Sequence, residues 1–388
     1  MKLSHLFFLL ALLAVFSWFM KHESTPQITP SGHKIKVGVI GPFSGVNKGQ
    51  GDSGLQGIKI SQALLPYLNN GDALEFIMID DKNVSEQSVE ALRELSEKHQ
   101  VTAIMIFSDS NSVLAIAKVA DRYQIPIFAL IASHPDITKY SSFVTQLNFD
   151  DTFQASVAAL YVRDELLLDK VAIVAQSNNA HYLYLANEFS RQFRAVEGEV
   201  TDTVYLTTSR QDYTEILQQI KNTAPELLYL PVDIDALFAI KTALVKLKWD
   251  PVIMVSDGIM ADVKAQTKYP MNFLAGMLAV DTYSYDMHLT DLGKQLKAQI
   301  QSMGINMRSI DTHSALGMEG YALLVDIMNQ CLESKNMRAC INDSILGIDR
   351  FEGIEGLISF DKTGKAHRSL VINTINDDAT MDFIVQVY

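Results

Sequence analysis

The sequence predicts an α/β fold made of two doubly wound halves. Strand-like runs alternate with amphipathic helical patterns from residue 35 onward, the order typical of parallel α/β sheets. These runs, such as IKVGVI at 35–40, are apolar almost throughout, as expected for strands buried on both faces. The alternation restarts near residue 150, and each half has a size that suits one doubly wound domain.

The opening unit sets the pattern. The strand at 35–40 leads into a glycine-rich loop, 41–54, and then into a helix near 54–68. The glycines are expected to let this loop turn sharply and approach another surface closely. Gly49, Gly51 and Gly54 formally match the G-x-G-x-x-G dinucleotide fingerprint, but they lie about ten residues beyond the strand end. A pyrophosphate needs the tight first turn, so we do not expect a nucleotide site here.

The later elements follow in order. In the rest of the first half, strands are expected at 74–80, 101–107 and 125–131, with helices near 85–98 and 110–122. In the second half, helices near 152–167, 182–195, 213–221 and 236–246 alternate with strands at 170–175, 200–206, 226–232 and 251–257. In the tail, helices near 289–303, 314–332 and 338–346 precede strands within 351–375 and 381–388, with a tight turn at 361–364.

Composition indicates an ordinary globular protein. The 388 residues are 48% hydrophobic and 20% charged, and the net charge is −13. Binding to a phosphate backbone needs clustered lysine and arginine, so we expect no nucleic-acid partner. No G-x-S-x-G, H-E-x-x-H, P-loop or C-x-x-C motif occurs, so the sequence gives no reason to expect an enzyme or a cofactor.

The N-terminus has the form of an export segment. Residues 1–20 combine a lysine with an apolar run that is short for a membrane span, as in a secretory signal. Bulky residues, Trp18 to Lys21, stand where a cleavage site needs small ones, so a cleaved signal peptide and a retained N-terminal anchor both stay open. No cysteine follows to carry a lipid. Residues 21–34 are expected to form a polar linker, and the protein is expected in the periplasm.

The two cysteines, Cys331 and Cys340, are close in the sequence. In an oxidising compartment such a pair is expected to form a disulfide. Closing a loop of about ten residues would stabilise the fold by roughly 2.5–3 kcal/mol in the chain-entropy model. A metal site is not expected, because no histidine lies nearby and two ligands would be missing.

Ligands of doubly wound sheets bind beyond the carboxyl ends of the strands. The segments that follow the expected strands are 41–54, 81–85, 108–111, 132–134, 176–184, 231–235 and 256–258. Ser110 begins a helix, where free N–H groups can hold a carboxylate, and Asp257 could bind an ammonium group. Plain helix capping and a plain loop aspartate are the competing interpretations. We expect His134 and His181 to be solvated loop histidines. The aspartate pairs at 80–81 and 150–151 lie at the ends of expected elements, where we expect them to act as caps.

Three segments carry a resemblance to a known family. They are IKVGVIGPFSG with GQGDSGLQGIKI, then IPIFALIASHPDIT, and finally GYALLVDIMNQC followed by FEGIEGLISFDKTGKAHR. Their order and separation resemble the type I periplasmic solute-binding proteins, specifically the branched-chain amino-acid (Leu/Ile/Val) branch of ABC transporters. The likeness covers about residue 35 to the end.

The resemblance implies two lobes joined by a hinge of three crossovers, near residues 149, 281 and 368. The first lobe would combine 35–149 with 281–368, and the second 150–280 with 369–388. The family holds an amino acid in the cleft between the lobes, which close around it.

The resemblance also implies a set of ligand-binding residues. Ser110 matches the helix-start serine that binds the ligand carboxylate, and Ala132 with Ser133 matches the pair after the inner strand. Asp257 matches the acid that binds the ammonium group. Gln50 and Tyr182 fall at or near aromatic positions, and the glutamine indicates a ligand more polar than leucine.

The main hypothesis is therefore an exported protein that captures an amino acid or similar small polar metabolite. It would deliver this ligand to a membrane partner, either an ABC permease or a sensor. The competing hypothesis is a regulatory interaction module of the cell envelope, with the same fold and no small-molecule ligand.

Overall fold

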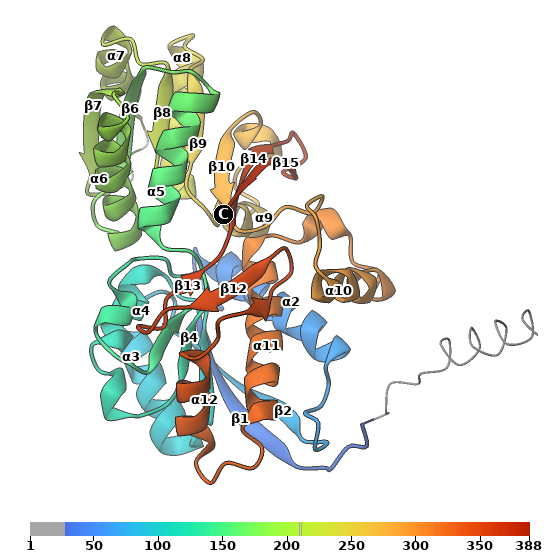
Figure 1. The fold of residues 1–388 in the computed structure, drawn as a ribbon. Helices are drawn as coiled ribbons and strands as arrows, with labels where there is room; N and C mark the ends of the chain where they lie inside the picture. The colour runs from blue at the N-terminus through green and yellow to red at the C-terminus, as the bar shows by residue number, and fades with distance from the viewer. Residues whose placement is uncertain (1–27, 209, 211) are drawn as a thin grey trace, which may run out of the picture.

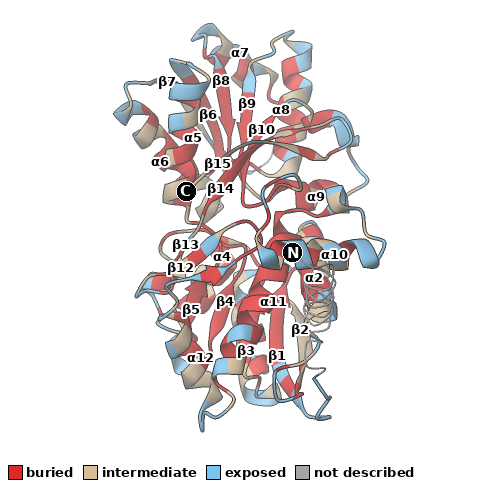
Figure 2. Ribbon diagram, turned by 45° about the vertical axis from the view of Figure 1, so that its right-hand side comes forward, coloured by how far each residue is buried: buried red, intermediate tan, exposed pale blue. Residues whose placement is uncertain are grey.

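The computed structural model describes residues 28–208, 210 and 212–388. The expected signal or anchor at 1–20 and the linker up to residue 27 lie outside these described residues. Two α/β bodies lie one above the other, each around its own sheet (Figure 1). The inner strands of both sheets are largely buried, whereas most of the edge strands are partly exposed and other exposed residues gather on the outer helices and loops (Figure 2). None of the described helices is long and apolar enough to cross a membrane.

The first sheet has five parallel strands in the order β2-β1-β3-β4-β5. The strands are β1 (Lys34–Gly41), β2 (Ala73–Asp80), β3 (Ala103–Ile106), β4 (Ile127–Ala129) and β5 (Val144–Gln146). The helices around this sheet are α2 (Lys48–Leu64), α3 (Ser85–Glu94), α4 (Ser110–Ala117), α11 (Thr312–Gln330) and α12 (Met337–Ile345). Thus the sequence-distant helices α11 and α12 complete the first body.

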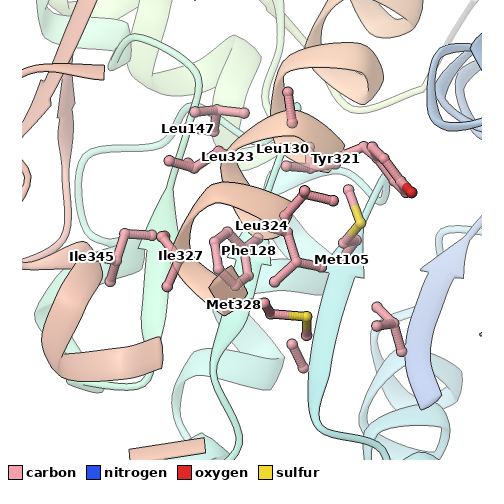
Figure 3. Packing of buried hydrophobic residues seen from close by; sticks show 14 of the residues in the cluster. Met105, Phe128, Leu130, Leu147, Tyr321, Leu323, Leu324, Ile327, Met328 and Ile345 are labelled. Atoms are coloured by element: carbon pink, nitrogen blue, oxygen red, sulfur yellow. The ribbon is translucent and has the colours of Figure 1, made fainter. Parts of the chain in front are cut away.

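The two faces of the first sheet have separate cores. One face packs against α2, α11 and α12, and the other packs against α3 and α4. Figure 3 shows the first of these cores, where Met105 of β3 and Phe128 of β4, with Leu130 just after β4, meet Leu324 and Met328 of α11. This two-sided burial explains why the strands read as continuous apolar runs in the sequence.

The second sheet has seven strands in the order β15-β14-β10-β9-β8-β6-β7. Its parallel strands are β6 (Lys170–Gln176), β7 (Glu199–Leu206), β8 (Leu227–Leu230), β9 (Val252–Val255) and β10 (Leu278–Asp281). Two antiparallel strands, β14 (Leu370–Ile375) and β15 (Met381–Val387), extend it. One face packs against α5 (Asp151–Leu160) and α6 (Ala180–Ala195), the other against α7 (Thr214–Asn222), α8 (Ile234–Lys246) and α9 (Ile259–Ala265).

The chain passes between the two bodies at three places: between β5 and α5, between β10 and α10 (Asp291–Ser302), and between β13 and β14. A small third sheet of β11 (Phe351–Glu352), β12 (Leu357–Phe360) and β13 (Ala366–His367) lies beside the last passage. The predicted turn lies between β12 and β13, where Gly364 N donates to Asp361 O.

The glycine-rich opening differs from the prediction. Helix α2 begins at Lys48, so the expected loop at 41–54 is helical over its second half. Three of its glycines allow close packing: a Cβ on Gly49 would lie 2.3 Å from Ala261 O, one on Gly54 2.2 Å from Phe107 Cδ1, and one on Gly57 2.0 Å from Ser314 O. The close contacts with α9, Phe107 and α11 override the low helix propensity of glycine.

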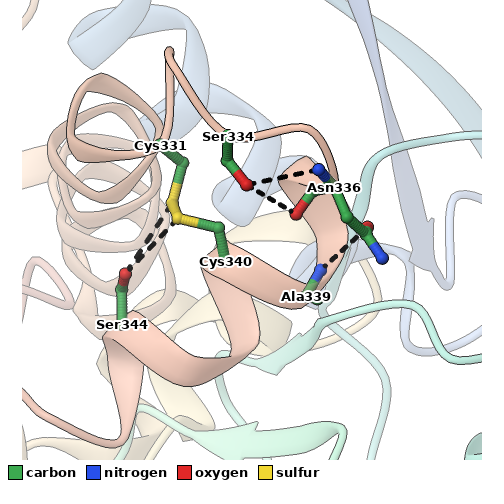
Figure 4. Close-up of a disulfide and its surroundings, with 6 residues drawn as sticks. All are labelled: Cys331, Ser334, Asn336, Ala339, Cys340 and Ser344. Carbon is green, nitrogen blue, oxygen red and sulfur yellow. Dashed lines mark hydrogen bonds between the residues drawn. A yellow bond between two sulfur atoms is a disulfide. The ribbon is translucent and has the colours of Figure 1, made fainter.

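Cys331 and Cys340 form the predicted disulfide, which ties the end of α11 to α12 (Figure 4). Their Cα atoms are 5.8 Å apart, and Cys331 is fully buried. The Ser344 hydroxyl lies 3.7 Å from Cys331 Sγ and 3.8 Å from Cys340 Sγ. The bridge therefore fixes the turn between two helices that cover the same face of the first sheet.

Candidate functional site

A cavity of about 250 Å³ lies where the carboxyl ends of the two sheets meet. Its walls come from loops and first helical turns that follow β1, β2, β3, β4, β6, β8 and β9, together with the start of α11. The lining residues are Asn47, Gln50, Asn83, Asp109, Ser110, Asn111, Ile131, Ala132, Ser133, Gln176, Asn178, Asn179, His181, Tyr182, Asp233, Asp257, Gly258, Ile259, Asp262 and His313. All seven segments expected to carry ligand residues contribute to this wall.

The structure brings the predicted site residues together in this one cavity. Ser110, Ala132 and Ser133 line it from the first body, and Tyr182 and Asp257 line it from the second. Gln50 lines it too, but from the first turn of helix α2 rather than from a loop.

The two bodies touch across the cavity. Asn111 Oδ1 accepts a bond from Ala180 N at 3.0 Å, and Asn111 Nδ2 donates to Asn178 O at 3.3 Å. Near α2, Gln50 Nε2 donates to Asp262 Oδ2 at 3.1 Å. These hydrogen bonds therefore connect the two bodies on two sides of the cavity.

His181 is the central charged group of the wall, and reading it as a solvated loop histidine was wrong. It lies in the first turn of α6 with 13% of its side chain exposed. Its Nδ1 is 2.9 Å from Asp151 Oδ1 and 3.1 Å from Ser133 Oγ, and its Nε2 is 3.4 Å from Asp257 Oδ1. Burial opposes the charged imidazole, but the carboxylates of Asp151 and Asp257 raise the pKa of His181 to about 9. His181 is therefore a cation at neutral pH.

The carboxylates beside His181 have different roles. Asp150 caps α5 as expected, accepting bonds from Thr152 N and Phe153 N, whereas Asp151 is fully buried against the imidazole. Burial raises the pKa of Asp257, although His181 opposes this. Asn148 Nδ2 donates to Asp257 Oδ2 at 3.2 Å, while Asp257 Oδ1 is buried with no hydrogen-bond partner among the described residues. The charged partner of Asp257 Oδ1 is the imidazolium of His181, whose Nε2 lies 3.4 Å away.

The start of helix α4 carries a carboxylate of its own. Asp109 is the N-cap, and its Oδ1 accepts from Ser112 N at 2.9 Å. Ser110 follows it, and its Oγ accepts a bond from His134 N at 3.3 Å. Burial raises the pKa of Asp109. The sequence predicted that a ligand carboxylate could bind at the start of α4. This helix start already carries the acidic side chain of Asp109.

A chain of hydrogen bonds links this helix start to α9. Asp109 N donates to Asn83 Oδ1 at 2.9 Å, and Asn83 Nδ2 donates to Gln50 Oε1 at 3.0 Å. Gln50 in turn donates to Asp262. Burial raises the pKa of Asp262 to about 7 despite that bond, and the nearby Asp311 and Asp233 add to the rise. This side of the cavity is crowded with acidic groups.

Gly258 and His313 form the floor beside Asp257. Gly258 has φ +76°, and a Cβ there would lie 2.7 Å from His313 Nε2, so both backbone and space require glycine. His313 is 5% exposed, and burial lowers its pKa to about 4, so its imidazole is neutral. Its Nδ1 is buried without a hydrogen-bond partner among the described residues.

Comparison with known proteins identifies the family of this chain. The sequence pattern of a family described as "Periplasmic binding protein" matches residues 34–380. "Leu/Ile/Val-binding protein homolog 6" of Brucella suis is 27% identical over 202 residues, which is 51% of this chain and 51% of that protein. The Brucella melitensis protein of the same name is 26% identical over 193 residues, 50% of this chain and 49% of that protein. The chain thus spans about half the length of the curated relatives it matches.

Solved structures share the fold. A leucine-binding protein from Thermotoga maritima superposes with a TM-score of 0.81 at 22% identity, covering 91% of this chain and 98% of that one. A branched-chain amino-acid transporter protein from Streptococcus pneumoniae, in complex with isoleucine, gives 0.79 at 18% identity, covering 90% and 99%. A solute-binding protein from R. palustris, in complex with 4-hydroxybenzoate, gives 0.77 at 22% identity, covering 91% and 97%. Because the family pattern extends from the first strand to the last hairpin, the chain belongs to the periplasmic binding proteins, a family of non-enzymatic, extracytoplasmic solute-binding proteins.

Proposed function

We propose that this protein captures an amino acid or a similar small polar metabolite in the cavity between its two bodies. The observation that carries the proposal is the polar cavity of about 250 Å³, whose wall combines the predicted residues of both halves. A site of this kind between two domains is a common place for small-molecule binding. We further propose that the bodies are lobes, 35–149 with 281–368 and 150–280 with 369–388, that close on the ligand.

The ligand's carboxylate would lie against Ser110 and Ser133, within reach of the positive charge of His181. Its ammonium group would donate to the carboxylate of Asp257, whose Oδ1 also lies 3.4 Å from His181 Nε2. Ala132 and Tyr182 supply the less polar surfaces of the same wall. The hydrogen bond from Gln50 to Asp262 makes the far side polar, which supports a ligand more polar than leucine.

The solute would be delivered to a membrane partner, an ABC permease or a membrane-bound sensor. Family membership supports this step, because its solved relatives include ABC transporter substrate-binding proteins. The weak cleavage site beyond the N-terminal apolar run favours retention of this segment as an anchor. A retained anchor supports the sensor role as the alternative to delivery to a permease.

A thermal-shift screen tests the proposal, because a ligand that binds only the native state raises the melting temperature. The best ligand is then titrated calorimetrically into wild type and Asp257→Ala. Removing the partner of a buried ligand charge costs about 2–5 kcal/mol, so affinity should fall at least about thirtyfold. Asp250→Ala, which removes an exposed aspartate outside the cavity, is the matched control and should bind as wild type does.

Two results count against the proposal. Equal affinities of wild type and Asp257→Ala would remove Asp257 from the binding site. A protein that no amino acid or related metabolite stabilises would favour the competing function, an envelope interaction module.

A further inference from the structure

We propose that the captured solute carries a positively charged amine or guanidinium group, held by Asp262 and Asp233 beside Tyr182. This inference rests on the proposed function and narrows its ligand class. It concerns a cation in addition to the ammonium group of an ordinary amino-acid headgroup.

The first support is the charge of the cavity wall. Four lining side chains are carboxylates, Asp109, Asp233, Asp257 and Asp262. The described lining residues include no lysine or arginine, and of the two histidines only His181 is charged at neutral pH. Burial raises the pKa of Asp262 to about 7, so this carboxyl group is only partly ionised in the absence of a solute. A zwitterionic amino acid brings no net charge, whereas a solute with a further positive group would favour the ionised form of these carboxyl groups.

One aromatic side chain, Tyr182, lines the same cavity as these carboxyl groups. Burial raises the pKa of its hydroxyl, and the charges of Asp262, Asp233, Asp257 and Asp109 raise it further. An aromatic ring amid carboxylates suits an organic cation, because its face attracts positive charge.

Unpartnered polar atoms supply a second, independent support. Asp262 Oδ1 is buried and has no hydrogen-bond partner among the described residues. The side chain of His313, which lines the same wall, is 5% exposed and its Nδ1 is also without a partner. Carboxylate oxygens can only accept hydrogen bonds, whereas an ammonium group has three donors and a guanidinium five. A cation with several N–H donors can therefore satisfy these acceptors. A second carboxylate on the ligand cannot, because it has no hydrogen to donate.

The polar bonds around Asp262 position it for this role. Gln50 donates to Asp262 Oδ2, while Asp262 Oδ1 is buried and has no hydrogen-bond partner among the described residues. Gln176 Nε2 similarly donates to Asp233 Oδ2 at 2.6 Å, while Asp233 Oδ1 accepts from Ala236 N at the start of α8. Basic amino acids and small diamines both present the required chemistry. Leucine lacks it, and an aromatic acid such as 4-hydroxybenzoate has the opposite charge.

Calorimetric titration of the wild-type protein with lysine, putrescine, leucine and 4-hydroxybenzoate tests the inference. We expect lysine or putrescine to bind at least about thirtyfold more tightly than leucine or 4-hydroxybenzoate. Binding of lysine alone identifies a basic amino acid as the ligand class, and binding of putrescine alone identifies a diamine. Because this panel uses the unaltered protein, it does not depend on the folding of any variant.

The variant Asp262→Asn then tests the residue. It keeps the side-chain volume and the acceptor for Gln50, and we expect at least a thirtyfold loss of affinity for the cation with an unchanged or higher melting temperature. Asp250→Asn is the exposed control. Tight binding of leucine or another neutral amino acid, without the cations, would overturn the inference and leave the proposed function standing. Wild-type affinity of Asp262→Asn for the cation would also overturn it, and binding of no solute would defeat the proposed function itself.

Discussion

The His181 cluster yields a quantitative prediction about pH. Replacing this residue by His181→Gln removes the positive charge that lies between the buried Asp151 and Asp257. The rise of the pKa from the ordinary 6.5 to about 9 corresponds to about 3 kcal/mol, at roughly 1.4 kcal/mol per pH unit. Removing one partner of a buried ion pair costs about 3–5 kcal/mol, so near neutral pH the variant should be less stable by about 3 kcal/mol.

The sign of the pH dependence follows from proton binding. Between pH 6.5 and about 9 the folded protein holds a proton on His181 that the unfolded chain has released. The stabilisation is therefore fully present below pH 6.5 and is lost as the pH rises through about 9. Compared with wild type, the His181→Gln variant should lose less stability over this interval, and the two free energies of unfolding should approach each other above pH 9.

Urea unfolding at a series of pH values measures this difference directly, and NMR titration of the His181 ring protons reports its pKa. His288→Gln, which replaces an exposed histidine, is the matched control and should follow the wild-type curve. A His181 pKa at or below 6.5 would refute the reasoning. So would a stability difference between variant and wild type that stays constant from pH 6.5 to 9.5.

Two further predictions concern stability. The double variant Cys331→Ala/Cys340→Ala should lose about 2.7 kcal/mol in urea unfolding, the chain-entropy value for a loop of about ten residues; two alkylatable thiols in the purified exported protein would contradict the bond itself. Gly57→Ala should cost about 3 kcal/mol or more, because its Cβ would lie 2.0 Å from the backbone oxygen of Ser314. At the control site, Gly347→Ala, the nearest atom is 3.6 Å away, so a similar loss there would show that packing against α11 is not the cause.

Much of the fold could be predicted because its strands are buried on both faces. The runs at β3 and β8 are apolar throughout and those at β1 and β6 nearly so, and their carboxyl ends identified the segments that line the cavity. The short elements α9 and β10 were missed, since seven and four residues carry too little periodicity. The early start of α2 was missed because its glycines are typical of a loop when the sequence is considered alone. The contacts of these glycines with α9 and α11 explain why a helix forms there.

The charged centre of the site could not be predicted. His181 and Asp151 are 30 residues apart in the sequence, and their hydrogen bond exists only because α5 and α6 pack side by side. Asp262 lies in a helix that was not predicted, so its contact with Gln50 had no sequence signal. The one available signal was position: His181 and Asp233 follow strand ends, as Asp257 does.

The order of the chain bears on when this protein can fold. Helix α11 supplies eight of the buried residues that cover one face of the first sheet, Leu316, Tyr321, Ala322, Leu323, Leu324, Val325, Ile327 and Met328. The second sheet likewise ends in β14 and β15, the last strands of the chain. A nascent chain that stops before residue 312 therefore lacks helices α11 and α12 over one face of its first sheet and two strands of its second sheet. Neither body has its complete core until this last part of the chain has been synthesised.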